Sequence, residues 1–249
     1  MNRLLTNLGK KLSPGSEHLY TYWQGRFQDW LEGRSPSTAL GEAFLVSLEA
    51  GGLKPNTVGC AARALRRMGL DVPVPSMEWG EPNYLELEEV KRLIDRAPSL
   101  LVKTIIIVIF SAVARISEVL NLEVQDLELD AGVATMTRKG GRRERVALGK
   151  QGTEALREWL AHRRSRSKRV FMDYTYQDIY RMLKKLAREV GIPDFTPHRL
   201  RHSRVRHLRQ AGLDWEDISE LAGHTKTETT IKIYGRRKAE ERARLLVDF

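Results

Sequence analysis

Apolar and polar residues follow a helical spacing through most of the chain, and this pattern predicts a mainly α-helical protein. Several of the patterns also carry start signals, such as Ser16 before the first one and Thr196-Pro197 before a later one. We expect helices over residues 17–31, 38–50, 55–68, 86–96, 103–122, 154–162, 176–190, 197–211, 215–222 and 227–246.

Two short strands interrupt the helical pattern near the middle of the chain. Residues 133–137 and 143–148 have strand-like patterns, and Gly140-Gly141 between them supplies a flexible hairpin turn. The fold class predicted by these elements is mainly α with one small β-hairpin or sheet.

A proline-rich stretch divides the chain into unequal parts. Residues 70–83, LDVPVPSMEWGEPN, contain Pro73, Pro75 and Pro82, which is typical of a linker. We therefore expect a small helical domain at residues 1–70, a linker at 71–83 and a larger domain at 84–249.

The composition changes this picture by adding a strong positive charge. The 249 residues include 42 Lys and Arg against 32 Asp and Glu, which gives a net charge of +10. This length supports a hydrophobic core without disulfides or a structural metal, and Cys60 is the only cysteine. The charge favours a polyanionic partner, although composition alone does not separate nucleic acid from an acidic membrane or protein.

The sequence shows neither a membrane span nor a secretion signal. The longest apolar run, residues 104–114, lies between Lys103 and Arg115 and is far shorter than the ~20 residues that cross a bilayer. The first residues, MNRLLTNLGKKLSPG, mix charged and polar side chains among the apolar ones. We expect a cytoplasmic protein with no membrane partner.

The basic residues are clustered, as in proteins that contact nucleic-acid phosphates. One cluster lies on the expected hairpin, another at residues 163–169, and a third at 197–209 contains no acidic residue. A merely solvated face would normally intersperse acidic residues. The expected DNA-contacting residues are Arg138, Arg142, Arg143, Arg145, Arg199 and Arg204.

Two arginines combine with neighbouring polar residues into candidate anion sites. Arg115 ends the apolar run, and Glu118 follows three residues later, so the carboxylate either forms a structural ion pair or orients the guanidinium toward a substrate. His198 and Arg201 share one face at the start of a helix, where free amides and the dipole favour phosphate. The alternative is that His198 caps the helix or packs against it and that Arg201 forms a surface ion pair.

Three further residues are ambiguous when they are considered singly. Lys139 at the hairpin tip is either a mobile proton donor or a solvated lysine, Tyr234 is typical of a core or interface, and His224 of a helix end. Sequence motifs for a catalytic metal, an ATP-binding loop or a serine nucleophile are absent. We expect no metal and no cofactor.

Taken together, these residues stand in an order that resembles the tyrosine recombinases of the phage integrase and Xer class. Residues 196–234, TPHRLRHSRVRHLRQAGLDWEDISELAGHTKTETTIKIY, resemble the C-terminal signature of that family, and ARISEVLNLEVQDL at 114–127 resembles its first-arginine box. TRKGGRRERVAL at 137–148 resembles its lysine hairpin, and LELEEVKRLI at 85–94 the helix that opens its catalytic domain. The resemblance implies a two-domain, C-shaped clamp, with a helical core-binding domain before the catalytic domain.

The resemblance also implies a role for each candidate residue. Tyr234 would attack a DNA phosphodiester and leave a 3′-phosphotyrosyl link and a free 5′-hydroxyl. Arg115 and Arg201 would clamp the non-bridging oxygens, and Lys139 would protonate the leaving 5′-oxygen. This scheme needs no metal or nucleotide, because the covalent link keeps the energy of the broken bond.

The remaining candidates would assist. His198 would help proton transfer at the tyrosine or bond the phosphate, and His224 would donate to a non-bridging oxygen. Glu118 would support the first arginine without reacting.

The chain departs from the family pattern at two places. Val113 stands where the family usually has a glycine, two residues before the first arginine, and we expect an effect on local packing. Tyr234 lies ten residues after His224, one more than in the common pattern. The loop at 225–229 must absorb the extra residue, or a neighbouring subunit must deliver the tyrosine.

The implied partners are double-stranded DNA and further copies of the chain. Residues 235–249, GRRKAEERARLLVDF, end in an apolar group that contains Leu245, Leu246 and Val247. In the family such a tail docks on the adjacent protomer, which implies a homotetramer on paired sites.

The alternatives are a DNA-binding relative without activity, an enzyme like the type IB topoisomerases, and a protein that binds polyanions through charge alone. The intact set of arginines, lysine, histidines and tyrosine favours a recombinase that acts in integration, excision or dimer resolution. Its target sequence depends on groove contacts that a single chain does not reveal.

Overall fold

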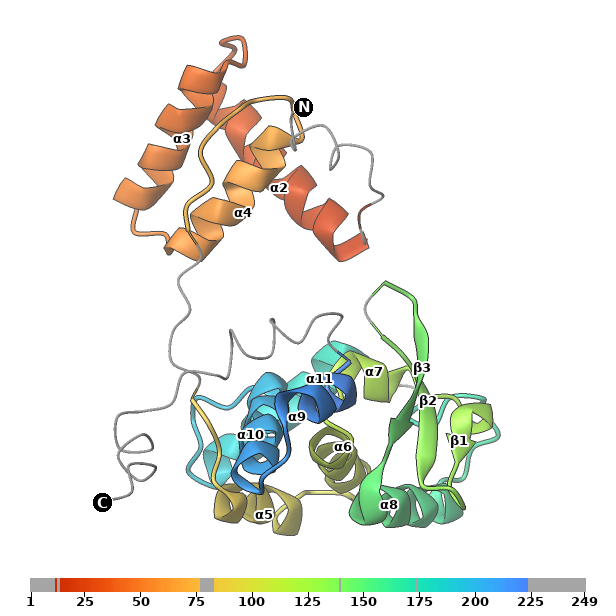
Figure 1. The fold of residues 1–249 in the computed structure, drawn as a ribbon. Coiled ribbons are helices and arrows are strands. Elements are labelled where there is room, and N and C mark those ends of the chain that lie inside the picture. The colour runs from red at the N-terminus through yellow and green to blue at the C-terminus, as the bar shows by residue number, and fades with distance from the viewer. Residues whose placement is uncertain (1–11, 13, 77–82, 139, 173, 224–249) are drawn as a thin grey trace, which may run out of the picture. The chain divides into compact units, whose positions relative to one another are not determined.

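The computed structural model describes residues 12, 14–76, 83–138, 140–172 and 174–223, and the chain divides into two compact units, Met1–Gly80 and Glu81–Phe249. Figure 1 shows a mainly helical protein with one small antiparallel sheet, which confirms the predicted fold class. Each unit has a hydrophobic core of its own. The helix expected at 227–246 lies outside the described residues.

Unit 1 consists of packed helices. They are α2 (Pro14–Leu31), α3 (Thr38–Ala50) and α4 (Pro55–Arg66). Ser37 caps α3 by accepting a hydrogen bond from the amide of Leu40 at 3.3 Å. Phe27, Phe44 and Leu65 are almost fully buried between the helices, so large side chains from each helix form one core.

Part of the expected linker belongs to unit 1. Val72 is fully buried, and Leu70 and Val74 pack against the same core. A Cβ atom at Gly41 would lie 2.7 Å from Cγ1 of Val72, so the glycine allows the chain to pass closely over α3. The alternating apolar residues of this stretch therefore anchor it, although its prolines are typical of a linker.

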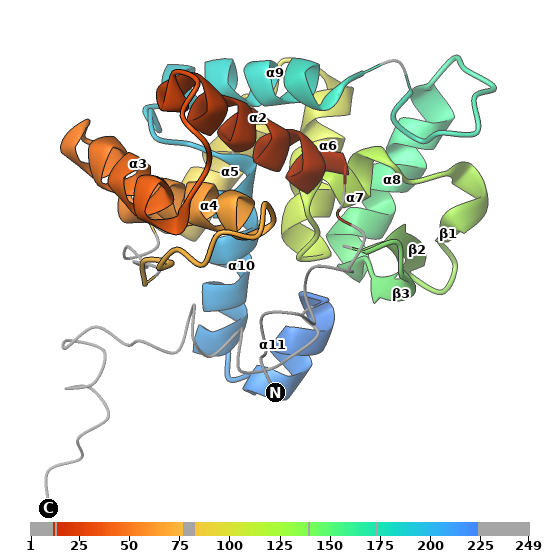
Figure 2. The same cartoon turned by 90° about the horizontal axis from the view of Figure 1, so that it is seen from above.

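Unit 2 has a buried helix at its centre. Its helical elements are α5 (Leu87–Asp95), α6 (Leu100–Ser111), α7 (Ile116–Leu120), the 3-10 turn η1 (Val124–Asp126), α8 (Gly149–His162), α9 (Tyr176–Glu189), α10 (Pro197–Gln210) and α11 (Trp215–Leu221). The apolar run predicted to be a core helix forms α6, with Ile105, Ile106 and Ile109 fully buried. Figure 2 shows α6 between α10 on one side and α8 with the sheet on the other, and α6 contacts both helices.

The sheet of unit 2 has the antiparallel order β1-β2-β3. Strands β2 (Val133–Thr137) and β3 (Arg143–Ala147) form the predicted hairpin, with Thr137 opposite Arg143 at its end. The sequence did not indicate β1 (Leu127–Glu128), which pairs with β2 over only two residues. Among the described residues, no helix has the length and hydropathy of a membrane span.

Candidate active site

The candidate site begins at a sharp turn after α6. The prediction of one helix over 103–122 is wrong, because α6 ends at Ser111 and α7 begins at Ile116. Val113 adopts a left-handed backbone with a φ of +49°, and the amide of Ala114 donates to the carbonyl of Ile109 at 3.1 Å. This is a Schellman-type helix end, in which the left-handed position usually holds glycine.

Val113 therefore affects more than the local packing that the sequence led us to expect. Its side chain is buried in a small cluster with Val205 and Ile218. A β-branched residue with positive φ is also strained at the backbone. The glycine that the resemblance led us to expect here would fit this helix end, and this chain forms the turn with a valine.

Arg115 is the N-cap residue of α7 and is held by Glu118. Its backbone amide donates to one carboxylate oxygen of Glu118 at 2.9 Å, and its guanidinium donates to the other at 2.6 Å. Glu118 is buried, whereas a quarter of the Arg115 side chain remains exposed. The ion pair that the sequence suggested is therefore present, and it holds a partly accessible guanidinium. The orientation of this guanidinium toward a substrate stays a prediction.

The charge of Glu118 is stabilised by its partners. Burial alone would raise the pKa of this carboxyl group, but the backbone amide of Arg115, the charge on Arg138 and the Arg115 guanidinium lower it below the ordinary value. Glu118 is consequently an ionised carboxylate at neutral pH, which fits its predicted role as support for the first arginine.

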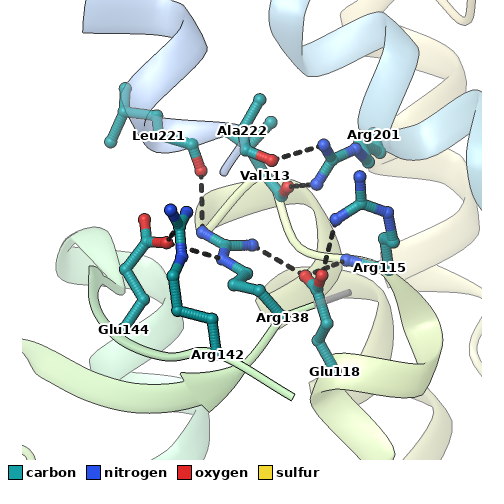
Figure 3. Close-up of polar contacts among 9 residues, drawn as sticks. All are labelled: Val113, Arg115, Glu118, Arg138, Arg142, Glu144, Arg201, Leu221 and Ala222. Carbon is teal, nitrogen blue, oxygen red and sulfur yellow. Dashed lines mark hydrogen bonds and ion pairs between the residues drawn. The ribbon is translucent and has the colours of Figure 1, made fainter. Parts of the chain in front are cut away.

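Arg201 lies within the first turns of α10 and reaches the same turn from the opposite side. Thr196 and Pro197 occupy the predicted N-cap and first helical positions, although the Thr196 side chain makes no capping hydrogen bond. The buried guanidinium of Arg201 donates to the carbonyls of Val113 and Ala222, each at 2.5 Å. Figure 3 shows that it lies beside the guanidinium of Arg115.

His198 stands one helical turn before Arg201 and belongs to the same cluster of charge. Partial desolvation and the positive charges of Arg201 and Arg115 lower the pKa of its imidazole, and Glu118 opposes this effect. Its side chain keeps an exposed surface. The structure therefore brings Arg115, Glu118, His198 and Arg201 together, with the histidine neutral at neutral pH.

Arg138 corrects one of the expected DNA contacts. Only 4% of the residue is exposed, and its guanidinium donates to Glu118 at 2.7 Å and to the carbonyl of Leu221 at 3.1 Å. The guanidinium lies between Glu118 and the carbonyl of Leu221 (Figure 3), and because it is buried it is not available to a phosphate at the surface.

Arg199 and Arg204 are partly buried and have contacts within unit 2, and their expected contacts with DNA stay a prediction. Arg199 donates to the backbone and side-chain oxygens of Asn83 at 3.0 and 2.9 Å and so fixes the entry of the chain into the unit. Arg204 stacks over the ring of Phe110 at 5.1 Å, and desolvation lowers its pKa. Both side chains support the packing of α10.

The other three expected DNA contacts lie on or beside β3 and remain accessible. More than half of each side chain is exposed, and each forms an ion pair with an acidic neighbour: Arg142 with Glu144, Arg143 with Asp126, and Arg145 with Glu128. The carboxylates are less exposed than the arginines, so each pair leaves part of the guanidinium open to solvent. Contact of these three arginines with DNA stays a prediction.

Three predicted catalytic residues, Lys139, His224 and Tyr234, lie outside the described residues. So does the tail at 235–249. In the parts of the chain that are described, no group of three or more metal-ligating side chains comes together.

The phage integrase family model matches residues 83–241. The chain is 30% identical to the tyrosine recombinase XerA of Thermococcus kodakarensis, across 94% of this chain and 91% of that protein. It is also 30% identical to the tyrosine recombinase XerD of Corynebacterium glutamicum, across 82% of each.

Solved structures share the fold. The Tn1549 transposon integrase in complex with circular intermediate DNA gives a TM-score of 0.76 at 15% identity and covers 96% of this chain and 95% of that one. The XerH recombinase bound to difH substrate, a post-cleavage complex, gives 0.75 at 17% identity, covering 92% and 78%. The chain belongs to the phage integrase family of tyrosine recombinases, enzymes that cleave and rejoin DNA at specific sites.

Proposed function

We propose that this chain carries out site-specific recombination with Tyr234 as its nucleophile. The tyrosine oxygen attacks a backbone phosphorus, the bond from phosphorus to the 5′-oxygen breaks, and the 3′-phosphate stays attached to the protein. Attack by the 5′-hydroxyl of a partner strand then reverses the step and releases the tyrosine. The phosphotyrosyl link conserves the energy of the broken bond, so this scheme needs no nucleotide.

The observation that carries the proposal is the convergence of Arg115, Arg201 and His198 (Figure 3 for the arginines). Glu118 orients the first guanidinium, and two backbone carbonyls hold the second. A guanidinium group can donate two hydrogen bonds to the oxygens of one phosphate, and preorganised positive charge stabilises the additional negative charge of a pentacoordinate transition state.

The proton transfers are assigned to the remaining candidates. With its lowered pKa, His198 is neutral at neutral pH and can accept a hydrogen bond from the attacking tyrosine or bond the phosphate. Lys139 is proposed to protonate the leaving 5′-oxygen, and His224 to donate to a non-bridging oxygen. These last two roles rest on the match to the family's motifs.

The partners that we propose are duplex DNA and three further copies of the chain. Unit 1 would act as the core-binding domain and unit 2 as the catalytic domain, with Arg142, Arg143 and Arg145 near the phosphates. The tail would dock on a neighbouring protomer in a tetramer on paired sites. A DNA substrate also favours the cytoplasm as the compartment.

The test is a search for the covalent intermediate. The protein is incubated with fragmented DNA from its own source, denatured and digested, and mass spectrometry identifies any tyrosine that carries a nucleotide. We expect the adduct on Tyr234, and the attached DNA then identifies the target site.

Two variants control this experiment. Tyr234→Phe should form no adduct, whereas Tyr20→Phe, at a partly buried position in the core of unit 1, should react like the wild type. Binding without an adduct, even on nicked duplexes from which the cleaved strand can diffuse away, would contradict the proposal.

A further inference from the structure

We propose that Arg138 is a positioning residue that joins the hairpin to Glu118 and to the end of α11, and thereby aligns the segments that carry the candidate catalytic residues. The inference rests on the proposed function for its catalytic consequence. The sequence placed Arg138 among the DNA contacts, and neither the family match nor the proposed chemistry assigns it a role.

The geometry of the contact is that of a buried junction. One nitrogen of the Arg138 guanidinium donates to Oε2 of Glu118 at 2.7 Å, and another donates to the carbonyl of Leu221 at 3.1 Å. The Arg138 and Glu118 side chains are only 2% and 3% exposed. A single side chain that directly follows β2 therefore connects this strand to α7 and α11 (Figure 3).

The contact with Glu118 links Arg138 to the first candidate arginine. Oε1 of Glu118 binds the Arg115 guanidinium, and Oε2 binds both the Arg115 amide and Arg138. Without Arg138 the buried carboxylate would lose one of its two guanidinium partners. Buried charges that lose a partner force their surroundings to rearrange, so Arg115 would lose part of its orientation.

Arg138 lies next to a candidate catalytic residue in the sequence, so its contacts bear on the position of that residue. It directly precedes Lys139, and its amide donates to the carbonyl of Arg142 at 2.7 Å, across the hairpin. Leu221 lies three residues before His224. The junction thus fixes the backbone beside two candidate catalytic residues relative to Arg115.

Gly223 is shaped to admit the Arg138 side chain. It has a φ of +59°, and a Cβ atom placed on it would lie 2.6 Å from Nε and 2.8 Å from Cζ of Arg138. The last described residue before His224 therefore packs its backbone directly on the guanidinium. This close approach is a second contact between Arg138 and the end of α11.

The first readout uses the full chain without DNA. Wild type, Arg138→Met and Arg138→Lys are compared with Arg157→Met, because Arg157 forms an exposed pair with Asp130 that involves no site residue. Hydrogen–deuterium exchange is measured in peptides that cover 140–145 and 217–223. We expect Arg138→Met to raise exchange by about fivefold or more in both peptides and Arg157→Met to leave it unchanged.

The second readout separates positioning from DNA binding. On a nicked duplex that carries the site recovered from the Tyr234 adduct, we expect Arg138→Met to slow single-turnover cleavage by about 10- to 100-fold at saturating DNA. The Kd for this DNA should change by no more than about twofold, because the guanidinium is buried and does not lie on the protein surface that would contact DNA. In a Glu118→Gln background the same substitution should add much less, since the two residues act through one contact.

Each outcome decides the proposal. Unchanged exchange, or a loss of affinity without a loss of rate, would overturn it. Arg138→Lys keeps the charge but cannot reach both the carboxylate of Glu118 and the carbonyl of Leu221, so its exchange and cleavage rates should lie between those of the wild type and Arg138→Met. It replaces the methionine variant if that variant does not fold. A wild type that forms no adduct defeats the proposed function alone, because the exchange data still establish or refute the junction.

Discussion

At the scale of single residues, two short contacts hold Arg201 in a fixed geometry. Its guanidinium binds the Val113 and Ala222 carbonyls together. A lysine ammonium cannot contact both carbonyls and still reach a phosphate in the same way. We expect Arg201→Lys to lower the single-turnover cleavage rate by about 100- to 1,000-fold with little change in DNA affinity.

The measurement is the rate of adduct formation at saturating duplex, with Arg157→Lys as the matched control on an exposed ion pair. A cleavage rate for Arg201→Lys within about threefold of the wild type would show that the fixed guanidinium does not stabilise the transition state.

His207 gives unit 2 a dependence of stability on pH. It is buried against the edge of Phe110, and desolvation, with Arg204 and Arg206 nearby, lowers its pKa although Glu86 acts in the opposite direction. The folded state thus binds a proton less readily than the unfolded state, whose histidine pKa is about 6.5. The neutral ring therefore makes its full contribution to the free energy of unfolding above a pH of about 6.5. This contribution falls as the pH decreases from there toward the pKa of His207 in the folded state.

This prediction is checked by urea unfolding between about pH 7.5 and 5, where one proton changes the free energy of unfolding by at most ~1.4 kcal/mol per pH unit. His207→Phe keeps an aromatic ring that never titrates, so its stability should decline less steeply than that of the wild type. Parallel curves for the two proteins would contradict the assignment.

The burial of Arg138 follows from its place in the strand pattern and not from its charge. Clustered arginines on a hairpin suggested a phosphate-contacting surface, which stays a prediction for the exposed Arg142, Arg143 and Arg145. Side chains alternate along a strand, however, and Ala134 and Met136 of β2 are buried. The same alternation places Arg138 on the inner face, a signal that charge counting overlooked.

At the scale of elements, the turn between α6 and α7 creates the site, and its energetics can be tested at Val113. Glycine relieves the positive φ but loses a buried side chain, whereas alanine loses most of the side chain and keeps the strain. We expect Val113→Gly to be more stable than Val113→Ala by about 1 kcal/mol, the reverse of the order in a helix.

Val205 provides the matched control, because it is buried in the same cluster but lies within α10. There the alanine variant should be more stable than the glycine variant by about 1 kcal/mol. Denaturant unfolding of the four variants decides the question, and the helical order at both positions would contradict a left-handed conformation at residue 113.

Elements with clear boundary signals were predicted well, and the broken helix was not. Pro197 fixes the start of α10, and the apolar run at 104–114 fixes the existence of α6. The turn at 112–115 was missed because apolar residues continue through it and valine gives no sign of a left-handed position. The cluster of Arg115 and Arg201 was found from the family motifs, whereas the carbonyls that hold Arg201 depend on tertiary packing.

At the scale of the whole molecule, the net charge of +10 predicts strongly salt-dependent DNA binding. Each phosphate contact contributes a slope of about −0.9 to the logarithm of affinity against the logarithm of salt concentration. Replacing Arg142, Arg143 and Arg145 together with alanine should make the slope shallower by up to ~2.7. Arg157→Ala should leave the slope as in the wild type, and an unchanged slope in the triple variant would remove the hairpin from the DNA interface.

Assembly is the last property that the sequence predicts for the whole molecule, through the tail at 235–249. Leu245, Leu246 and Val247 form an apolar group after a charged stretch. Burial of such a group against a neighbouring protomer removes it from water and lowers the free energy of the assembly. We expect deletion of residues 243–249 to change the affinity for a single site by no more than about twofold, because the deletion retains the residues that contact DNA. Cooperative assembly on paired sites should be abolished, because the contact between protomers is lost.

Gel-shift titrations on duplexes with one and two sites measure both quantities on the same protein. Leu245→Ser with Leu246→Ser keeps the chain length and should reproduce the deletion, which separates an apolar contact from a mere requirement for length. Exchange of three charged residues, Glu240, Glu241 and Arg242, for alanine should leave assembly largely intact if burial of the apolar end provides the free energy. Cooperativity that survives the deletion would mean that the protomers associate through other surfaces, and the tail would then have no part in forming the tetramer.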